Sequence, residues 1–336
     1  MKKYAIHFYL LINLSLILAM KPDDINAQKV TPYDSGYYTR YPDKLIIMAY
    51  IVQKYAPFRI SAPVDENDLK YRSNSKLSLG AGVTYHNLTL NLSFGFGFLN
   101  SGDDKKGKTK GLDFQFHLYP HKLAIDAIGS FKKGYYLEPE DYPPPSVNRY
   151  YQRADIKRNL IGLAAYKVPN AEKFSYRAAM TQNDWQTKSA GSLLFGGEVY
   201  FGSMKGDSAL VPNKIANNFP QAGINKVNFF GIGPGVGYAY TLVIEKYFFI
   251  TGSVVANLDL NFSSEDGTAG KNEKTTLTPG TVYKGAIGYN SSIWSLSANI
   301  IGNALLVGSS SSSEEYFLQT GNYRLTIAKK IGSKKD

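Results

Sequence analysis

The 336-residue chain contains no cysteine, few charged residues and, beyond its first twenty positions, no long apolar run. The absence of cysteine excludes disulfides, thiolate metal sites and a lipid anchor attached to cysteine. Charged residues make up 19% of the chain, against about 25% in ordinary globular proteins. After residue 20 no segment reaches 18 consecutive apolar residues, which excludes a transmembrane helix there.

The first 27 residues have the layout of a secretory signal peptide. Lys2 and Lys3 precede an apolar run over residues 5–20, and a polar stretch follows that ends at Ala27. As a helix this run would reach about 24 Å, which is shorter than a bilayer core of about 30 Å. We therefore expect export with cleavage near Ala27 rather than a retained membrane anchor.

The formal net charge of the chain is +11. In an exported protein such a balance favours contact with anionic lipid or glycolipid headgroups over contact with nucleic acid, for which the sequence contains no binding motif.

The stretch NLTLNLSFGFGF, residues 87–98, places large apolar residues at every second position. These are Leu88, Leu90, Leu92, Phe94, Phe96 and Phe98, and the residues between them are Thr89, Asn91, Ser93, Gly95 and Gly97. A period of two predicts a β-strand with one apolar face. The opposite face lacks the charges that the solvent side of a soluble sandwich needs, so it favours an enclosed polar interior.

The same alternation predicts thirteen strand segments. They cover residues 44–55, 76–86, 88–98, 112–119, 122–132, 155–167, 173–182, 189–201, 228–242, 247–260, 281–289, 293–301 and 316–327. Bacterial single-chain barrels have an even number of strands, so one segment is not a wall strand or a fourteenth lies near residues 207–212. We predict an all-β, antiparallel transmembrane β-barrel of about 12 strands, with 14 possible and a soluble exported sandwich as the alternative fold.

The predicted organisation has four parts. A signal peptide covers residues 1–27, an N-terminal periplasmic segment 28–43, the outer-membrane barrel 44–331 and a short tail 332–336.

Seven charged or titratable residues are candidates for a polar cluster inside the barrel. They are Asp113, His117, Asp126, Lys132, Arg177, Glu198 and Arg324. Two interpretations remain open: salt-bridged side chains that fill a small barrel, or a charged constriction that selects solutes. No motif for a metal or another cofactor is present, so we predict neither.

A catalytic role is the main alternative. A histidine-dependent hydrolase similar to the lipid A deacylases would require Phe-x-His-x-Ser on one strand, and the segment FQFHLY has Tyr119 in place of the serine. A triad also needs a hydroxyl, a histidine and a carboxylate that converge, which the sequence does not establish. We therefore expect no enzymatic activity.

The segment KFSYRAAMTQNDWQTKSAGSLLFGG, residues 173–197, resembles the exported bacterial family known as domain of unknown function 4421. The segments LKYRSNSKLSLGAGVTY and GIGPGVGYAYTLVIEKYFFITGS add to the resemblance. The matching positions are Phe174, Ser175, Tyr176, Arg177, Gln182, Gln186, Ser189, Ala190, Gly191 and Ser192. The resemblance implies an outer-membrane barrel but no particular activity.

Together these observations predict a barrel in the outer membrane of a Gram-negative bacterium, structural or conducting small solutes through a filled or narrow polar lumen. An outer-membrane enzyme acting on lipid or glycolipid, and a soluble exported β-protein that binds a ligand, are the alternatives. The expected partners are outer-membrane lipids, glycolipid and, during biogenesis, the barrel-assembly machinery.

Overall fold

The computed structural model describes residues 33–63, 67–85, 88–100, 103–120, 122–140, 142–143 and 149–332. The expected signal peptide and residues 333–336 of the expected tail lie outside these ranges. Within them, no helix has both the length and the apolar character needed to cross a membrane.

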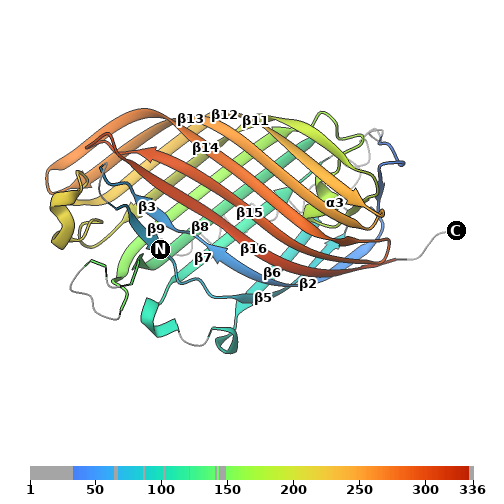
Figure 1. Cartoon of the computed structure of the whole chain (residues 1–336), viewed down its shortest axis with the longest axis horizontal. Coiled ribbons are helices and arrows are strands. Elements are labelled where there is room, and N and C mark those ends of the chain that lie inside the picture. Colours follow the sequence, from blue (N-terminus) through green and yellow to red (C-terminus); the bar gives the residue numbers. More distant parts are fainter. Residues whose placement is uncertain are drawn as a thin grey trace, which may run out of the picture. The chain divides into compact units, whose positions relative to one another are not determined.

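The described chain is built almost entirely of strands (Figure 1). The strands are β1 (Tyr38–Arg40), β2 (Leu45–Tyr55), β3 (Phe58–Ile60), β4 (Leu69–Arg72), β5 (Ser78–Tyr85), β6 (Leu88–Gly95), β7 (Lys110–Leu118), β8 (Leu123–Glu138), β9 (Gln152–Lys167), β10 (Asp184–Gln186), β11 (Ala190–Lys205), β12 (Ile224–Ile244), β13 (Phe248–Gly267), β14 (Gly270–Asn290), β15 (Trp294–Gly308) and β16 (Glu315–Ile331). The helices are α3 (Tyr176–Met180) and the 3-10 turns Gly97–Leu99, Asp103–Lys106 and Asn213–Asn218.

Ten of these strands form a closed antiparallel ring. Their order is β15-β14-β13-β12-β11-β9-β8-β4-β3-β16, and β16 pairs back onto β15 over fifteen residues. Strands β2, β5 and β6 extend from β16, and β7 extends from β8. The predicted all-β antiparallel barrel is therefore confirmed.

The number of wall strands depends on two interruptions. Strands β2 and β3 pair with successive parts of β16, so together they form one interrupted wall strand. Strand β4 pairs with β3 and strand β5 pairs with β2, so β4 and β5 form a second interrupted wall strand. Counting each pair once gives twelve strands that run alternately up and down, the number favoured by the sequence.

The strand predicted over residues 173–182 is wrong. This segment contains α3, whose N-cap Ser175 accepts a hydrogen bond from the Ala178 backbone N–H. The alternate aromatic residues Phe174 and Tyr176 imitate a strand, but the alanines and methionine that follow are strong helix formers. Residues 207–212 form no strand, so the possible fourteenth strand is absent. The predicted segment that is not a wall strand is 173–182.

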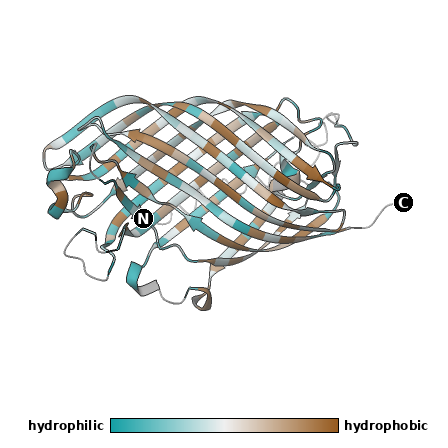
Figure 2. Ribbon diagram, in the orientation of Figure 1, coloured by the Kyte–Doolittle hydropathy of each residue, from teal (hydrophilic) through white to brown (hydrophobic). Residues whose placement is uncertain are grey.

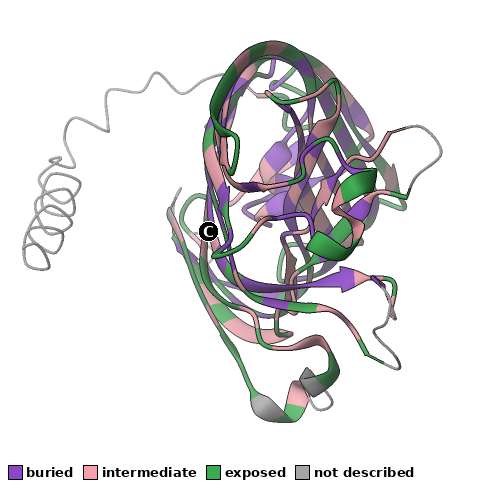
Figure 3. Cartoon of the chain, turned by 90° about the vertical axis from the view of Figure 1, so that its left-hand side faces the viewer, coloured by how far each residue is buried: buried purple, intermediate pink, exposed green. Residues whose placement is uncertain are grey.

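The outside of the barrel is apolar. Along β13 exposed and buried residues alternate without a break from Phe248 to Ser263, so that Val254 is 56% exposed and Leu258 50%. Stripes of apolar residues cross the strands in Figure 2, and the view along the barrel in Figure 3 places buried residues on its inner side. An exposed apolar surface that continues around a barrel requires a cover of lipid.

The two ends of the barrel differ. Residues 245–247 and 291–293 form short turns at the end where β2 begins and β16 finishes, which we call the turn end. Glu245 and Lys246 adopt positive φ values of 50° and 64° there, as tight hairpins require. At the opposite end, which we call the loop end, β8 finishes, β9 begins and the long connection 206–223 lies.

If lipid covers the outer face, Leu258→Arg should reduce the free energy of unfolding by about 2–4 kcal/mol, as a charge near the bilayer midplane does in such barrels. The exposed Asn272 lies near the tip of the β13–β14 hairpin, and Asn272→Arg should change stability by less than about 0.5 kcal/mol. Guanidinium unfolding of the protein in lipid vesicles measures both. An equally small effect at Leu258 would contradict a lipid-facing surface.

Candidate functional site: the filled interior of the barrel

The interior of the barrel is filled with side chains along its whole length. Every second residue of β13 from Phe249 to Glu265 points inward and is at most 4% exposed. In an open channel these side chains would contact water. The structure therefore has a packed interior at all levels of this strand.

The loop-end half of the interior contains a large hydrophobic cluster beside buried polar residues such as Glu265 and Asn261, whereas the sequence predicted a polar lumen. Phe58, Tyr71 and Met204 pack there with residues from several other wall strands. The connection 206–223 contributes Leu210, Val211 and Phe219, each at most 3% exposed. This connection thus folds onto a hydrophobic core inside the wall and seals the loop end.

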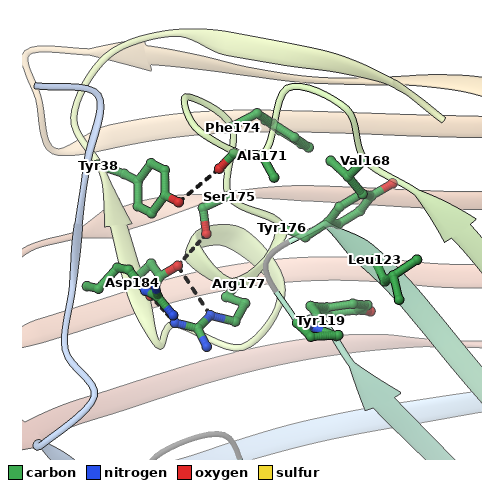
Figure 4. A pocket seen from close by; sticks show the side chains of 12 residues that line it. Tyr38, Tyr119, Leu123, Val168, Ala171, Phe174, Ser175, Tyr176, Arg177 and Asp184 are labelled. Carbon is green, nitrogen blue, oxygen red and sulfur yellow. Dashed lines mark hydrogen bonds and ion pairs between the residues drawn. The ribbon is translucent and has the colours of Figure 1, made fainter. Parts of the chain in front are cut away.

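The connection between β9 and β11, residues 168–189, seals the turn end, and we call it the turn-end plug. Its strand β10 pairs with β1, so the segment before the barrel joins the plug. The hydroxyl of Tyr38 donates to the carbonyl oxygen of Ala171 at 2.9 Å (Figure 4). This plug is the same stretch that carries the family resemblance.

The buried carboxylate of Asp184 connects several side chains of the plug by hydrogen bonds. Its carboxylate is almost fully buried and accepts hydrogen bonds from Ser175 Oγ at 2.6 Å and from Arg177 Nη2 at 2.7 Å (Figure 4). Gln186 adds a bond from its Nε2 to the carbonyl of Lys173 at 2.6 Å. Burial, and then the negative charge of Asp184, raise the pKa of Tyr41 to about 12, so the Tyr41 hydroxyl stays protonated at neutral pH.

The plug is hydrogen-bonded to the wall. Gln182 Nε2 donates to Ser297 Oγ at 3.0 Å, and the hydroxyls of Tyr176 and Ser253 contact each other. The side chain of Asn290 donates to two plug carbonyls, at 3.2 and 3.0 Å. Because β13, β14 and β15 all take part, the plug is fixed across a broad section of the barrel.

Four of the candidate residues form two contacts between β7 and β8, the ion pair of Lys132 with Asp113 and the hydrogen bond of His117 with Asp126. Asp113 accepts from Lys132 Nζ at 2.5 Å, and also from Ser130. Asp126 accepts from His117 Nδ1 at 2.6 Å. The register of the β7–β8 hairpin places His117 directly opposite Asp126 and Asp113 opposite Ser130.

Lys284, on the far strand β14, forms an ion pair with Asp126 and is a residue that the sequence analysis did not identify. Its ammonium group contacts the other oxygen of Asp126 and lies 4.9 Å from the ring centres of both Tyr119 and Tyr176. The alternation along β14 could have placed Lys284 inside, but no pattern shows that β14 faces β8 across the barrel.

The other three candidates lie apart from these pairs and from one another. Arg177 belongs to the plug rather than to a wall strand. Arg324 lies over the ring of Tyr50, 4.2 Å from its centre. Glu198 has a carboxylate, not a cation, as its neighbour: a Cβ on Gly280 would lie 2.4 Å from both Glu198 Oε1 and Asp259 Oδ2. Glycine at position 280 therefore makes the room that these two acids occupy.

His117 and Tyr119 share one carboxylate, because the Tyr119 hydroxyl also donates to Asp126, at 2.9 Å. This arrangement ties the FQFHLY segment to a buried ion pair. Among the described residues no group of three or more histidine, aspartate or glutamate side chains is arranged to hold a metal ion.

A closed antiparallel ring, an apolar outer face and a packed interior define the class of the protein as a bacterial outer-membrane type of β-barrel. The chain belongs to the family described as domain of unknown function (DUF4421), whose model matches residues 32–328. This confirms the resemblance seen in the sequence. No curated protein matches the chain.

Several solved barrels are similar at low identity. Neisserial surface protein A is 10% identical, with 84% of this chain and 96% of that chain covered and a TM-score of 0.23. OmpT of Vibrio cholerae is 8% identical, with 85% and 98% covered and a TM-score of 0.28. OprG of Pseudomonas aeruginosa is 11% identical, with 88% and 99% covered and a TM-score of 0.22.

Removal of the Asp184 carboxylate should destabilise the folded protein. Asp184→Ala leaves the Arg177 guanidinium without the counter-ion that now binds it, which should reduce the free energy of unfolding by about 3–5 kcal/mol. The double variant Arg177→Met with Asp184→Leu should recover much of this loss, since no unpaired charge remains. Guanidinium unfolding in vesicles, with cleavage of the plug by added protease as a second readout, tests the comparison. Equal losses in both variants would contradict the assigned pairing.

Proposed function

We propose that this protein is a filled β-barrel of the Gram-negative outer membrane with a structural role in the envelope, and that it does not act as an open diffusion channel at rest. The observation that carries the proposal is the burial of the inward side chains along all of β13. A diffusion pore needs a continuous aqueous path, and the packed interior leaves none along this strand.

Two features support placement in a membrane. The outer face carries large exposed apolar residues on many wall strands, from β2 to β16. At the turn end Tyr247, Phe248 and Trp294 are 42%, 54% and 44% exposed, and Tyr247 stacks on Tyr289. Aromatic residues are enriched where such barrels meet the membrane interface. Because bacterial outer-membrane barrels have short turns on the periplasmic side and long loops outside, the turn end faces the periplasm in this proposal.

The two seals are independent of each other. The loop end is closed by apolar packing of the connection 206–223, whereas the turn end is closed by the hydrogen-bonded plug. Solute passage would require both to move. On β7 and β8, Lys132 contacts Asp113 and His117 contacts Asp126 across the hairpin, which supports a role in holding the strands together rather than in selecting ions.

We propose no catalytic role. His117 Nδ1 is bound to a buried carboxylate that also binds Lys284, and the residue two positions further is Tyr119 rather than the serine expected of a hydrolase. This hydrogen bond to a buried carboxylate is sufficient to explain the position of His117.

Conductance in planar bilayers tests the filled barrel. The wild-type protein should give no steady channel currents, and neither should a variant in which a short Gly-Ser turn replaces residues 169–188, because the loop-end seal remains. A variant that also replaces 206–223 with such a turn should conduct, since both seals are gone.

Each variant is first checked for the heat-dependent shift in gel mobility that folded barrels give. Steady, long-lived currents through the wild-type protein would overturn the proposal.

A further inference from the structure

The wall of the barrel forks beside β8. Near the loop end, Lys70–Arg72 of β4 pairs with Tyr136–Glu138 of β8, and the ring is closed there. Further toward the turn end, β7 occupies that edge of β8 from Lys133 to Ile125. Within the described residues β6 pairs only with β5, and β7 pairs only with β8. The facing edges of β6 and β7 are therefore not hydrogen-bonded to each other.

A polar cavity of about 310 Å³ lies at this fork. Its lining comes from both branches: Ser78, Ser93 and Gly95 on β5 and β6, and Gly111 and Asp113 on β7. Small side chains and glycines leave the space open. The cavity therefore lies where the two branches of the wall separate, and not in the packed interior along β13.

The cavity is strongly basic. Lys54, Lys76 and Lys132 line it together with a single carboxylate, Asp113. Lys132 Nζ lies 2.5 Å and Lys54 Nζ 3.9 Å from Asp113 Oδ2, so one anion already serves two lysines. Three positive charges against one negative charge leave a place for a further anion.

A fourth positive charge lies behind Lys132. Arg158 is the register partner of Lys132 across β8 and β9 and is fully buried. None of its three guanidinium nitrogens has a hydrogen-bond partner in the described structure. Asp113 lies within electrostatic range of Arg158, so this single carboxylate serves Arg158 as well as Lys54 and Lys132. A further anion in the adjacent cavity would therefore lower the energy of the group.

The outer rim of the fork is apolar. On β6 the side chains of Leu92 and Phe94 are 69% and 65% exposed, and on β7 those of Leu112 and Phe114 are 66% and 48% exposed. A molecule that satisfies both regions has an anionic head and long apolar chains. Phosphate is the anion that lysine side chains commonly bind.

We propose that the fork between β6 and β7 is a lateral binding site for an anionic phospholipid. Its phosphate lies among Lys54, Lys76 and Lys132, and its acyl chains cover the apolar residues of β6 and β7 beside the cavity. The inference rests on the proposed membrane location of the barrel.

Lipid binding to the full-length protein in the uncharged detergent dodecyl maltoside tests the site. Native mass spectrometry should show one tightly retained phosphatidylglycerol, with an affinity at least about tenfold higher than for phosphatidylcholine of the same acyl chains. Lys54→Gln with Lys76→Gln should remove this preference. Lys205→Gln with Lys214→Gln, two exposed lysines away from the fork, should leave it unchanged.

Further measurements distinguish other occupants. Glycerol phosphate should compete with the lipid at least about tenfold more weakly than phosphatidylglycerol does, because it lacks the acyl chains. Equal competition would show that the cavity takes a soluble anion and would overturn the lipid assignment. A dimer that excludes lipid, detected by light scattering, would overturn it in favour of a second copy at the fork.

Heat-dependent gel mobility separates this inference from the proposed function. If the wild-type protein shows the shift but has no preference for phosphatidylglycerol, the site is refuted and the barrel is not. If the shift itself is absent, the membrane barrel fails as well.

Discussion

The backbone hydrogen bonds of the wall are the constraint on which the rest of the structure depends. Where lipid replaces water, each peptide N–H and C=O needs a partner in the protein, and a sheet meets this need only by closing on itself. Here closure occurs through the long ladder between β15 and β16 and through the short contacts of β3 with β4 and of β4 with β8. The fork at β6 and β7 is the one place in the described wall where closure is incomplete.

The closed wall then dictates what lies inside it. A barrel of this size encloses more space than its own inward side chains fill, and the chain supplies two connections that enter from opposite ends. The loop-end connection adds apolar side chains to a hydrophobic cluster in the loop-end half of the interior. The turn-end plug brings both apolar and polar residues, and its buried charges Arg177 and Asp184 stabilise each other as an ion pair.

The sequence predicted the wall strands better than the side-chain contacts inside the barrel. Alternation with a period of two identifies a strand and its outer face without knowledge of its neighbours, and for this reason the hairpin of β5 and β6 could be located from residues 76–98. Position along a strand does not reveal which side chain lies opposite across the interior. The partnership of Asp126 with Lys284, 158 residues later in the chain, could therefore not be predicted.

Two errors have the same physical origin. The alternation of Phe174 and Tyr176 predicts a strand where the plug contains a helix, because their burial comes from packing inside the barrel rather than from a position in the wall. The loop-end core was missed because Leu210, Val211 and Phe219 belong to an irregular connection. In both cases tertiary contacts with the inner wall, which have no periodic signature, decide the local structure.

The absence of cysteine in the chain makes the central claim, a packed interior, directly measurable. Single cysteines at Asn257, which points inward on β13, and at Asn272, which is exposed at the loop end, can be compared in membranes for reaction with a charged maleimide. The packed interior predicts that Asn257→Cys reacts at least about 100-fold more slowly than Asn272→Cys, because reaction requires local opening. Comparable rates at the two positions would contradict it.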